Sequence, residues 1–200
     1  MKRFILLLAI LVIVVGAVSA RPGTMTIGPK FALNFATEGG DNSSYIKSST
    51  KFGIGGFFTY DILDQFGVQG ELLYNRKGCD ITAYNPVVTV TGSYLDIVAL
   101  AKYMIPIEGN FKPNVFAGPS LGLLLGATIY QGSQSADYSS NVSGADFGLI
   151  FGAGAAYKVG PGSIVFDLRY YVGLSNVNKD NQFSNTNQIF SINTGYAFPL

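Results

Sequence analysis

The sequence has 200 residues with 13 basic and 12 acidic side chains, and this near-neutral balance gives no basis for nucleic-acid binding. Only 12% of the residues are charged, against about a quarter in soluble domains, while Gly, Phe and Tyr are abundant. The sequence contains no His, which excludes Ser-His-Asp and Cys-His catalysis and His-ligated zinc, and its single Cys, Cys79, has no disulfide partner. We therefore expect no enzyme activity, no cofactor and no metal site.

Residues 1–20 begin with two basic side chains, continue in an apolar run and end in Val18-Ser19-Ala20. This is the layout of a secretory signal peptide with its cleavage site. The apolar run is shorter than the ~20 residues of a spanning helix, which disfavours the alternative of a membrane anchor. We expect a signal peptide at 1–20 and one mature domain at 21–200, which carries eleven basic and twelve acidic residues.

After residue 20, apolar and polar residues alternate with period two, which predicts strands. Eight such segments follow one another, near 29–36, 51–60, 66–77, 93–105, 114–125, 146–158, 164–174 and 190–198. No apolar stretch there reaches the length of a spanning helix. The chain is therefore expected to be all-β.

The connections between these segments alternate in length. Long ones, rich in Ser, Asn, Thr and Gly, lie at 37–50, 78–92, 127–145 and 175–187, and short ones lie at 61–65, 106–111 and 159–162. In an up-and-down barrel, alternate connections lie at opposite ends, and outer-membrane barrels have short periplasmic turns and long extracellular loops. The pattern predicts an eight-stranded antiparallel up-and-down transmembrane β-barrel with that asymmetry.

Three features favour an apolar face turned to lipid over a soluble barrel or sandwich. The polar faces carry mostly Gly, Ala, Ser and Asn, as expected of a narrow interior. The apolar faces lack charge over the ~10 residues that cover a lipid band of roughly 25 Å. Tyrosines gather near segment ends, where interfacial girdles form: Tyr60, Tyr74, Tyr94, Tyr103, Tyr157, Tyr170 and Tyr196.

The few charges in the segments lie on the polar faces. A cation turned to lipid there would cost ~2–4 kcal/mol, and a one-residue slip would expose all of these charges together. We expect a network of charges in the lumen, formed by Glu71, Asp96, Lys102, Asp167 and Arg169. Such a network is typical of a narrow polar interior that satisfies itself, and a functional role is the alternative.

Pro119 lies inside the fifth segment, on its apolar face. A closed barrel has no free edge where a missing N–H is harmless, and proline in sheets is found at edges or bulges. The sequence therefore predicts a bulge at Gly118-Pro119.

The last residues continue the alternation instead of ending in a polar tail. Their order, with Asn193, Gly195, Phe198 and Leu200, resembles the C-terminal signal read by the bacterial barrel-assembly machinery. The last strand must also pair with the first, because no unpaired edge is tolerated in lipid. We expect this segment to close the barrel and to serve as an assembly signal.

Several blocks resemble one known family across nearly the whole mature chain. They are "GPKFALNF", "GIGGFFTYD", "QGELLYNRKG", "YLDIVALAKY", "FAGPSLGLLLG", "DLRYYVGLSN" and "INTGYAF". They are similar to the outer-membrane β-barrel domain family common in Bacteroidetes, often labelled porin-like. The resemblance implies an eight-stranded barrel in the cell outer membrane and no defined activity.

Three hypotheses for function follow. The first is a non-enzymatic outer-membrane barrel with a structural or surface-interaction role through its extracellular loops. The second is a porin-like pore for small solutes, which inward glycines favour and bulky inward residues (Phe57, Leu100, Phe116 and Leu124) oppose. A soluble periplasmic ligand-binding barrel is the least favoured. The expected partners are outer-membrane lipid and the barrel-assembly machinery, and the sequence identifies no partner for the loops.

Overall fold

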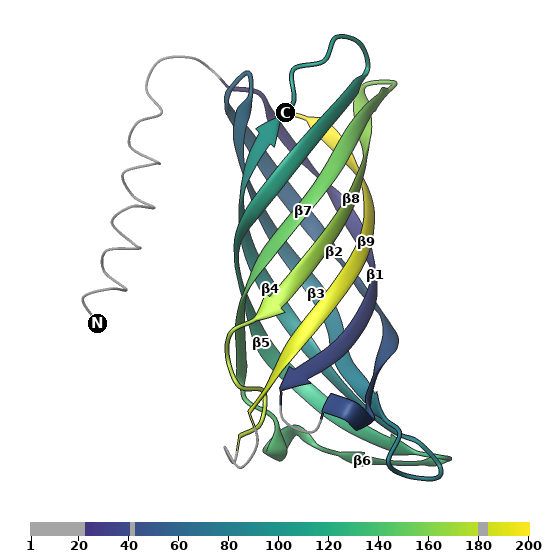
Figure 1. The fold of residues 1–200 in the computed structure, drawn as a ribbon. Coiled ribbons are helices and arrows are strands. Elements are labelled where there is room, and N and C mark those ends of the chain that lie inside the picture. The colour runs from purple at the N-terminus through teal and green to yellow at the C-terminus, as the bar shows by residue number, and fades with distance from the viewer. Residues whose placement is uncertain (1–22, 41–42, 180–183) are drawn as a thin grey trace, which may run out of the picture.

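The computed structural model describes residues 23–40, 43–179 and 184–200, so the expected signal peptide lies outside the described residues (Figure 1). The strands are β1 (Met25–Gly40), β2 (Ile46–Leu63), β3 (Phe66–Ile81), β4 (Val88–Met104), β5 (Phe111–Gln131), β6 (Gln134–Asp137), β7 (Ala145–Val159), β8 (Gly162–Gly173) and β9 (Asn185–Pro199). Two short 3-10 turns, η1 (Ser43–Tyr45) and η2 (Ser139–Asn141), lie in the connections. Among the residues that the structure describes, no helix is long and apolar enough to cross a membrane.

The strands form one closed antiparallel sheet. Each barrel strand pairs with its neighbours in chain order, β4 pairs with β5, and β9 pairs with β1 to complete the ring. The short β6 only folds back on the end of β5 and does not enter the barrel wall. The predicted eight-stranded up-and-down barrel is confirmed (Figure 1).

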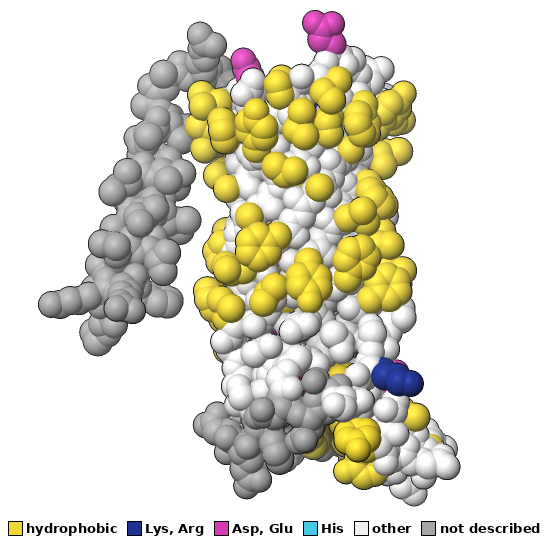
Figure 2. All heavy atoms as spheres, viewed as in Figure 1, with side chains coloured by type: hydrophobic (Ala, Val, Ile, Leu, Met, Phe, Trp, Pro, Cys, Tyr) yellow, Lys and Arg dark blue, Asp and Glu magenta, His cyan; other side chains and the backbone are white. Residues whose placement is uncertain are grey.

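The alternation of side chains also takes the predicted direction. Phe31 and Leu72 are 52% and 55% exposed, whereas Lys30 and Glu71 beside them in the sequence are 1% and 4% exposed. Figure 2 shows apolar side chains around the upper and middle part of the outer wall. A sheet with its large apolar residues outside and its charges inside fits a lipid surrounding.

The two ends of the barrel differ, although less than the sequence indicates. At one end, called here the turn end, the connections are 64–65, 105–110 and 160–161. At the other, the loop end, they are 41–45, 82–87, 132–144 and 174–184. Much of the first three predicted long loops is therefore strand, because Ser- and Thr-rich segments outside the lipid can form strands with water on both faces, whereas only 185–187 of the described part of the fourth is strand. Composition alone does not distinguish such strands from loops.

The loop-end parts of β2 to β5 extend beyond the apolar band. On β3 the outward positions after Tyr74 carry Arg76 and Asp80, and Lys47 on β2 is exposed beside them. The surface below the apolar band in Figure 2 is correspondingly pale, with a basic side chain on it. Charged outward residues mark the point where the strands leave the lipid.

The expected bulge at Gly118-Pro119 is wrong. The β4–β5 register is the same on both sides of it, with Ala101 opposite Ala117 and Val98 opposite Ser120. Pro119 is exposed on the outer face and stays in register with β7, so its missing N–H interrupts the ladder locally without inserting a residue. The irregularity of this strand pair lies instead at Ser93/Tyr94.

The tyrosine girdle is confirmed with one exception. Ring pairs lie on the outer wall near the strand ends, with Phe66 and Tyr103 at 5.0 Å and Tyr196 and Phe198 at 4.6 Å between centroids. Tyr94, by contrast, is 2% exposed and lies in the lumen. It shares the inward face of β4 with Asp96, a position that the alternation itself indicates.

Candidate functional site

The lumen holds a cluster of four charged side chains nearer the turn end, the first ion-pair cluster. It consists of Lys30 on β1, Glu71 on β3, and Asp167 and Arg169 on β8, all 5% exposed or less. Lys30 Nζ lies 2.7 Å from Glu71 Oε1 and 2.8 Å from Asp167 Oδ2. Arg169 donates to both oxygens of Glu71, at 2.8 and 3.1 Å, and to Asp167 at 2.9 Å. Two positive and two negative groups thus neutralise one another.

Such a cluster couples three strands that are distant in sequence. Burying each charge is costly, and the cost is offset only where partners and hydrogen bonds surround it. The paired donors of Arg169 match the two carboxylate oxygens of Glu71, which makes this a strong form of ion pair. Removing one member would leave an uncompensated charge in the interior.

Lys102 extends this cluster toward the turn end through a neutral group. Its Nζ donates to Gln69 Oε1 at 2.9 Å, and the amide of Gln69 in turn donates to Glu71. Thr59 also donates to Gln69, at 2.9 Å. Lys102 is therefore connected to the first ion-pair cluster by hydrogen bonds and not by direct contact with a carboxylate.

A second ion-pair cluster lies nearer the loop end. Lys77 Nζ lies 2.9 Å from Asp96 Oδ1 and 3.0 Å from Asp146 Oδ2. Asn75 donates to Asp96 at 2.8 Å, and Asn187 donates to Asp146 at 2.9 Å. One ammonium faces two carboxylates, so this cluster carries an excess of negative charge.

A layer of apolar side chains separates the two clusters: Ala36, Val98, Leu100, Phe116, Ile150, Tyr171 and Ile189. The Arg169 guanidinium lies 5.2 Å from the centre of the Phe116 ring, and Lys77 Nζ lies 4.6 Å from that of Tyr171. The cavity beside this layer measures about 30 Å³, roughly the volume of one water molecule. Ser120 Oγ and Asn193 Nδ2, both on its wall, have no hydrogen-bond partner among the described residues.

The inward glycines do not leave an open channel, because neighbouring side chains occupy the space beside them. A Cβ added at Gly152 would lie 2.4 Å from the Phe116 ring, and one at Gly154 would lie 2.3 Å from Asp167 Oδ1. One added at Gly53 would lie 1.8 Å from Asn75 Oδ1. These glycines make room for the large and charged groups of other strands.

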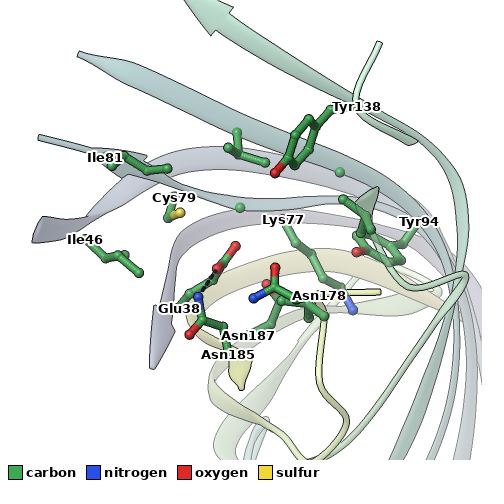
Figure 3. Close-up of a pocket in the computed structure, with 15 residues that line it drawn as sticks. Glu38, Ile46, Lys77, Cys79, Ile81, Tyr94, Tyr138, Asn178, Asn185 and Asn187 are labelled. Carbon is green, nitrogen blue, oxygen red and sulfur yellow. Dashed lines mark hydrogen bonds between the residues drawn. The ribbon is translucent and has the colours of Figure 1, made fainter. Parts of the chain in front are cut away.

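A larger cavity of about 110 Å³ opens beyond the second cluster, at the loop end (Figure 3). Glu38, Asn185 and Asn187 lie on one side of it, and Asn185 Nδ2 donates to Glu38 Oε2 at 3.4 Å. Ile46 and Ile81, from the neighbouring strands β2 and β3, also line it, with Ile46 beside Glu38. Cys79 also borders the cavity and is buried with a free thiol.

The structure divides the five predicted lumen charges between two places. Glu71, Asp167 and Arg169 meet in the first cluster, Lys102 reaches it through Gln69, and Asp96 belongs to the second cluster. Three further members, Lys30, Lys77 and Asp146, are not among the five predicted charges. The alternation in the sequence does indicate them, because each is a charged residue on the inward face of a predicted strand.

Of the residues predicted to form an assembly signal, Asn193, Gly195 and Phe198 lie on β9 and Leu200 directly follows it. Asn193 is 2% exposed in the lumen, and Gly195 faces the same side, close to the backbone of Pro29. Phe198 is 47% exposed on the outer wall opposite Ile27, and the Leu200 amide donates to the Met25 carbonyl at 3.0 Å. No group of three or more metal-ligating side chains is found among the described residues.

A family model described as "Outer membrane protein beta-barrel domain" matches residues 19–179 of the chain. No curated protein matches the chain significantly. Among solved structures, the chain is similar to OprG of Pseudomonas aeruginosa, with 15% identity, a TM-score of 0.54 and coverage of 92% of this chain and 98% of that one.

Two other solved structures are similar over most of their length. Ail, the attachment invasion locus protein of Yersinia pestis, has 18% identity, a TM-score of 0.50 and coverage of 89% of this chain and 100% of that one. Neisserial surface protein A has 17% identity, a TM-score of 0.51 and coverage of 86% and 95%. At these identities the likeness shows a common fold.

Proposed function

The chain belongs to the outer membrane protein β-barrel domain family, and from this premise we propose that it is a non-enzymatic barrel, closed to solutes, with a structural or surface-interaction role. The protein lies in the cell outer membrane, where lipid covers the apolar outer wall. In the proposed orientation, the loop end faces the exterior and the turn end faces the periplasm. Without His, the chain does not have the usual base for hydrolytic catalysis.

The proposal of a closed lumen rests on the side chains that fill the interior of the barrel. Two ion-pair clusters and the apolar layer between them follow one another along the axis. A solute would have to separate Lys30 and Arg169 from their carboxylates, which costs several kcal/mol per uncompensated buried charge. An interior that is filled in this way supports a scaffold more than a passage.

The loop end offers the groups for a surface interaction. Tyr45 and Tyr84, on two of its connections, are 58% and 57% exposed. Exposed tyrosines are enriched where proteins bind one another. Asp137 on β6 accepts a hydrogen bond from the Ser139 amide at 2.7 Å, which lowers the pKa of that carboxyl and keeps it ionised. The chemistry on this rim is thus aromatic and polar.

The alternative of a pore rested on the inward glycines. Gly53, Gly152 and Gly154 each lie against a side chain from another strand, so they contribute no free width. The cavity beside the apolar layer has the volume of about one water molecule. These observations favour the closed barrel over a passage for solutes.

Solute leakage from liposomes tests the proposal. Barrels refolded into vesicles loaded with a small sugar should release it no faster than protein-free vesicles, while a general porin at the same protein content releases it rapidly. Folding of the inserted protein is verified by its faster gel mobility before boiling. Leakage that rises in proportion to the folded protein would reject the closed lumen and establish the pore.

We further infer that β9 is recognised by the barrel-assembly machinery during insertion. The strand closes the ring by pairing with β1, from Thr26 opposite Pro199 to Gly40 opposite Asn185. It offers Tyr196 and Phe198 on its outer face, with their rings tilted against each other and 4.6 Å between centroids. A strand with an aromatic outer face and an edge that stays open until closure fits recognition by strand pairing.

A further inference from the structure

The loop-end cavity is lined by polar and apolar side chains. Glu38, Asn185 and Asn187, called here the polar wall, lie together, and Ile46 and Ile81 lie to one side of them, with Ile46 beside Glu38, in Figure 3. Its volume of about 110 Å³ corresponds to three or four water molecules. A concave site with an apolar wall and a few polar groups is typical of small-ligand sites.

The polar wall contains acceptors that lack a strong donor. Glu38 has no ion pair among the described residues, and its donors are the Asn185 amide at 3.4 Å and the Cys79 thiol, a weak donor. Asn185 Oδ1 is buried, and no described residue donates to it. Buried acceptors without donors are costly, so this wall favours a ligand that donates hydrogen bonds.

The charge around the cavity also favours a cation. Among the described residues, Lys77 is the one ammonium that lines it, and it is already held between Asp96 and Asp146. Lys51, the next inward cation, donates to Thr91 at 2.8 Å and does not line the cavity. Glu38 therefore adds a carboxylate to a region in which acidic groups already outnumber their partners.

We propose that this cavity binds a small organic cation, an alkylammonium of about four non-hydrogen atoms, since each such atom takes up roughly the volume of one water molecule. The ammonium donates to Glu38 and to Asn185 Oδ1, and the alkyl group packs against Ile46 and Ile81. An anion would meet acceptors where it needs donors. The site opens at the loop end, so binding does not depend on whether the lumen passes solutes.

Methyl NMR of isoleucine-labelled protein in micelles tests the site, with propylammonium as the probe. Saturable shifts at Ile46 and Ile81 are expected. Propanol has the same size and no charge. It should bind at least roughly tenfold more weakly than propylammonium, as expected when a charged hydrogen bond is lost. Potassium chloride, used in place of propylammonium at equal ionic strength, should cause no such shifts at Ile46 and Ile81.

Matched variants assign the binding to the cavity. Glu38→Gln should weaken propylammonium binding by roughly tenfold or more, whereas Glu108→Gln, the same change at an exposed turn-end residue, should leave it unchanged. Val177→Leu, which enlarges another side chain that lines the cavity and keeps Glu38, should also weaken binding and serves if the first variant does not fold. Equal binding of propanol, unsaturable shifts, or full binding in both cavity variants would overturn the proposal.

Discussion

Lys30 is the residue on which the first ion-pair cluster most directly depends. Its Nζ contacts both Glu71 and Asp167 and lies 5.0 Å from the centre of the Phe57 ring. It thereby connects β1 to β3 and to β8, which lie on either side of β1 in the barrel. In Lys30→Met, a side chain of similar length would remain, but two carboxylates would share Arg169 alone.

We expect Lys30→Met to lower the free energy of unfolding by about 3–5 kcal/mol, since it leaves a buried charge without its partner. Urea titration in lipid vesicles, followed by the gel mobility of the unboiled protein, measures this change. Lys112→Met is the matched control, because Lys112 is exposed at the turn end and donates only to the carbonyl of Ile107. Equal stability of both variants would show that the cluster contributes little.

Gly118 explains why Pro119 fits into β5 without a bulge. A Cβ at Gly118 would lie 1.9 Å from the Ala99 carbonyl oxygen, which belongs to backbone and has little room to move. The glycine therefore permits the close approach of β4 next to the proline. Space, and not an unusual backbone angle, is the requirement at this position.

Gly118→Ala should destabilise the barrel by roughly 1–3 kcal/mol, the usual cost of overpacking. Gly70→Ala is the matched control, because a Cβ at Gly70 meets nothing within 4 Å. The same urea titration compares the two variants. If Gly118→Ala is as stable as Gly70→Ala, then β4 and β5 separate more easily than this contact indicates.

At the scale of elements, β9 has the special task of closing the ring. Deleting Tyr196–Leu200 would remove its pairs with Ile27 of β1 and with Ser163 and Ile164 of β8. Lipid does not tolerate the open edges that would result. We expect the truncated protein to be absent from the outer membrane, as measured by membrane fractionation and by loss of the heat-dependent gel shift.

Deleting Gln134–Asp137 provides the control for this truncation. These residues form β6, which is exposed and pairs only with the end of β5, so its removal leaves the ring intact. This variant should insert at normal levels. Normal outer-membrane levels of the Tyr196–Leu200 deletion would contradict the role of β9 in closure and in assembly.

At the scale of the whole molecule, the sequence predicts which way residues face better than where they lie along the axis. Period two places Glu71 and Arg169 in the lumen, and the closed barrel confirms that direction. Their contact, however, joins residues 98 positions apart and depends on the stagger between β3 and β8. The register between β3 and β4, which places Asp96 opposite Leu73, likewise sends Asp96 to the other cluster, and no local pattern reports it.

The remaining differences also have local physical causes. Strand ends beyond the lipid contain the same Ser, Thr and Asn as loops, so residues 46–50 and 88–92 were expected as loops and are strand. Tyr94 was assigned to the girdle by its position near a segment end, although the alternation turns it inward. Aromatic rings in a narrow lumen can cover a cation, as Tyr94 does for Lys77 at 4.8 Å.

The length of β3 sets how far the molecule stands out of the membrane. Ile81 lies seven positions after Tyr74. At a rise of ~3.3 Å per residue and a tilt of ~40°, they span roughly 18 Å along the axis. The headgroup region on each side of a bilayer is only about 5–8 Å deep. The part of the rim formed by β2 to β5 therefore stands clear of the headgroups, and a molecule can reach the groups inside it without touching lipid.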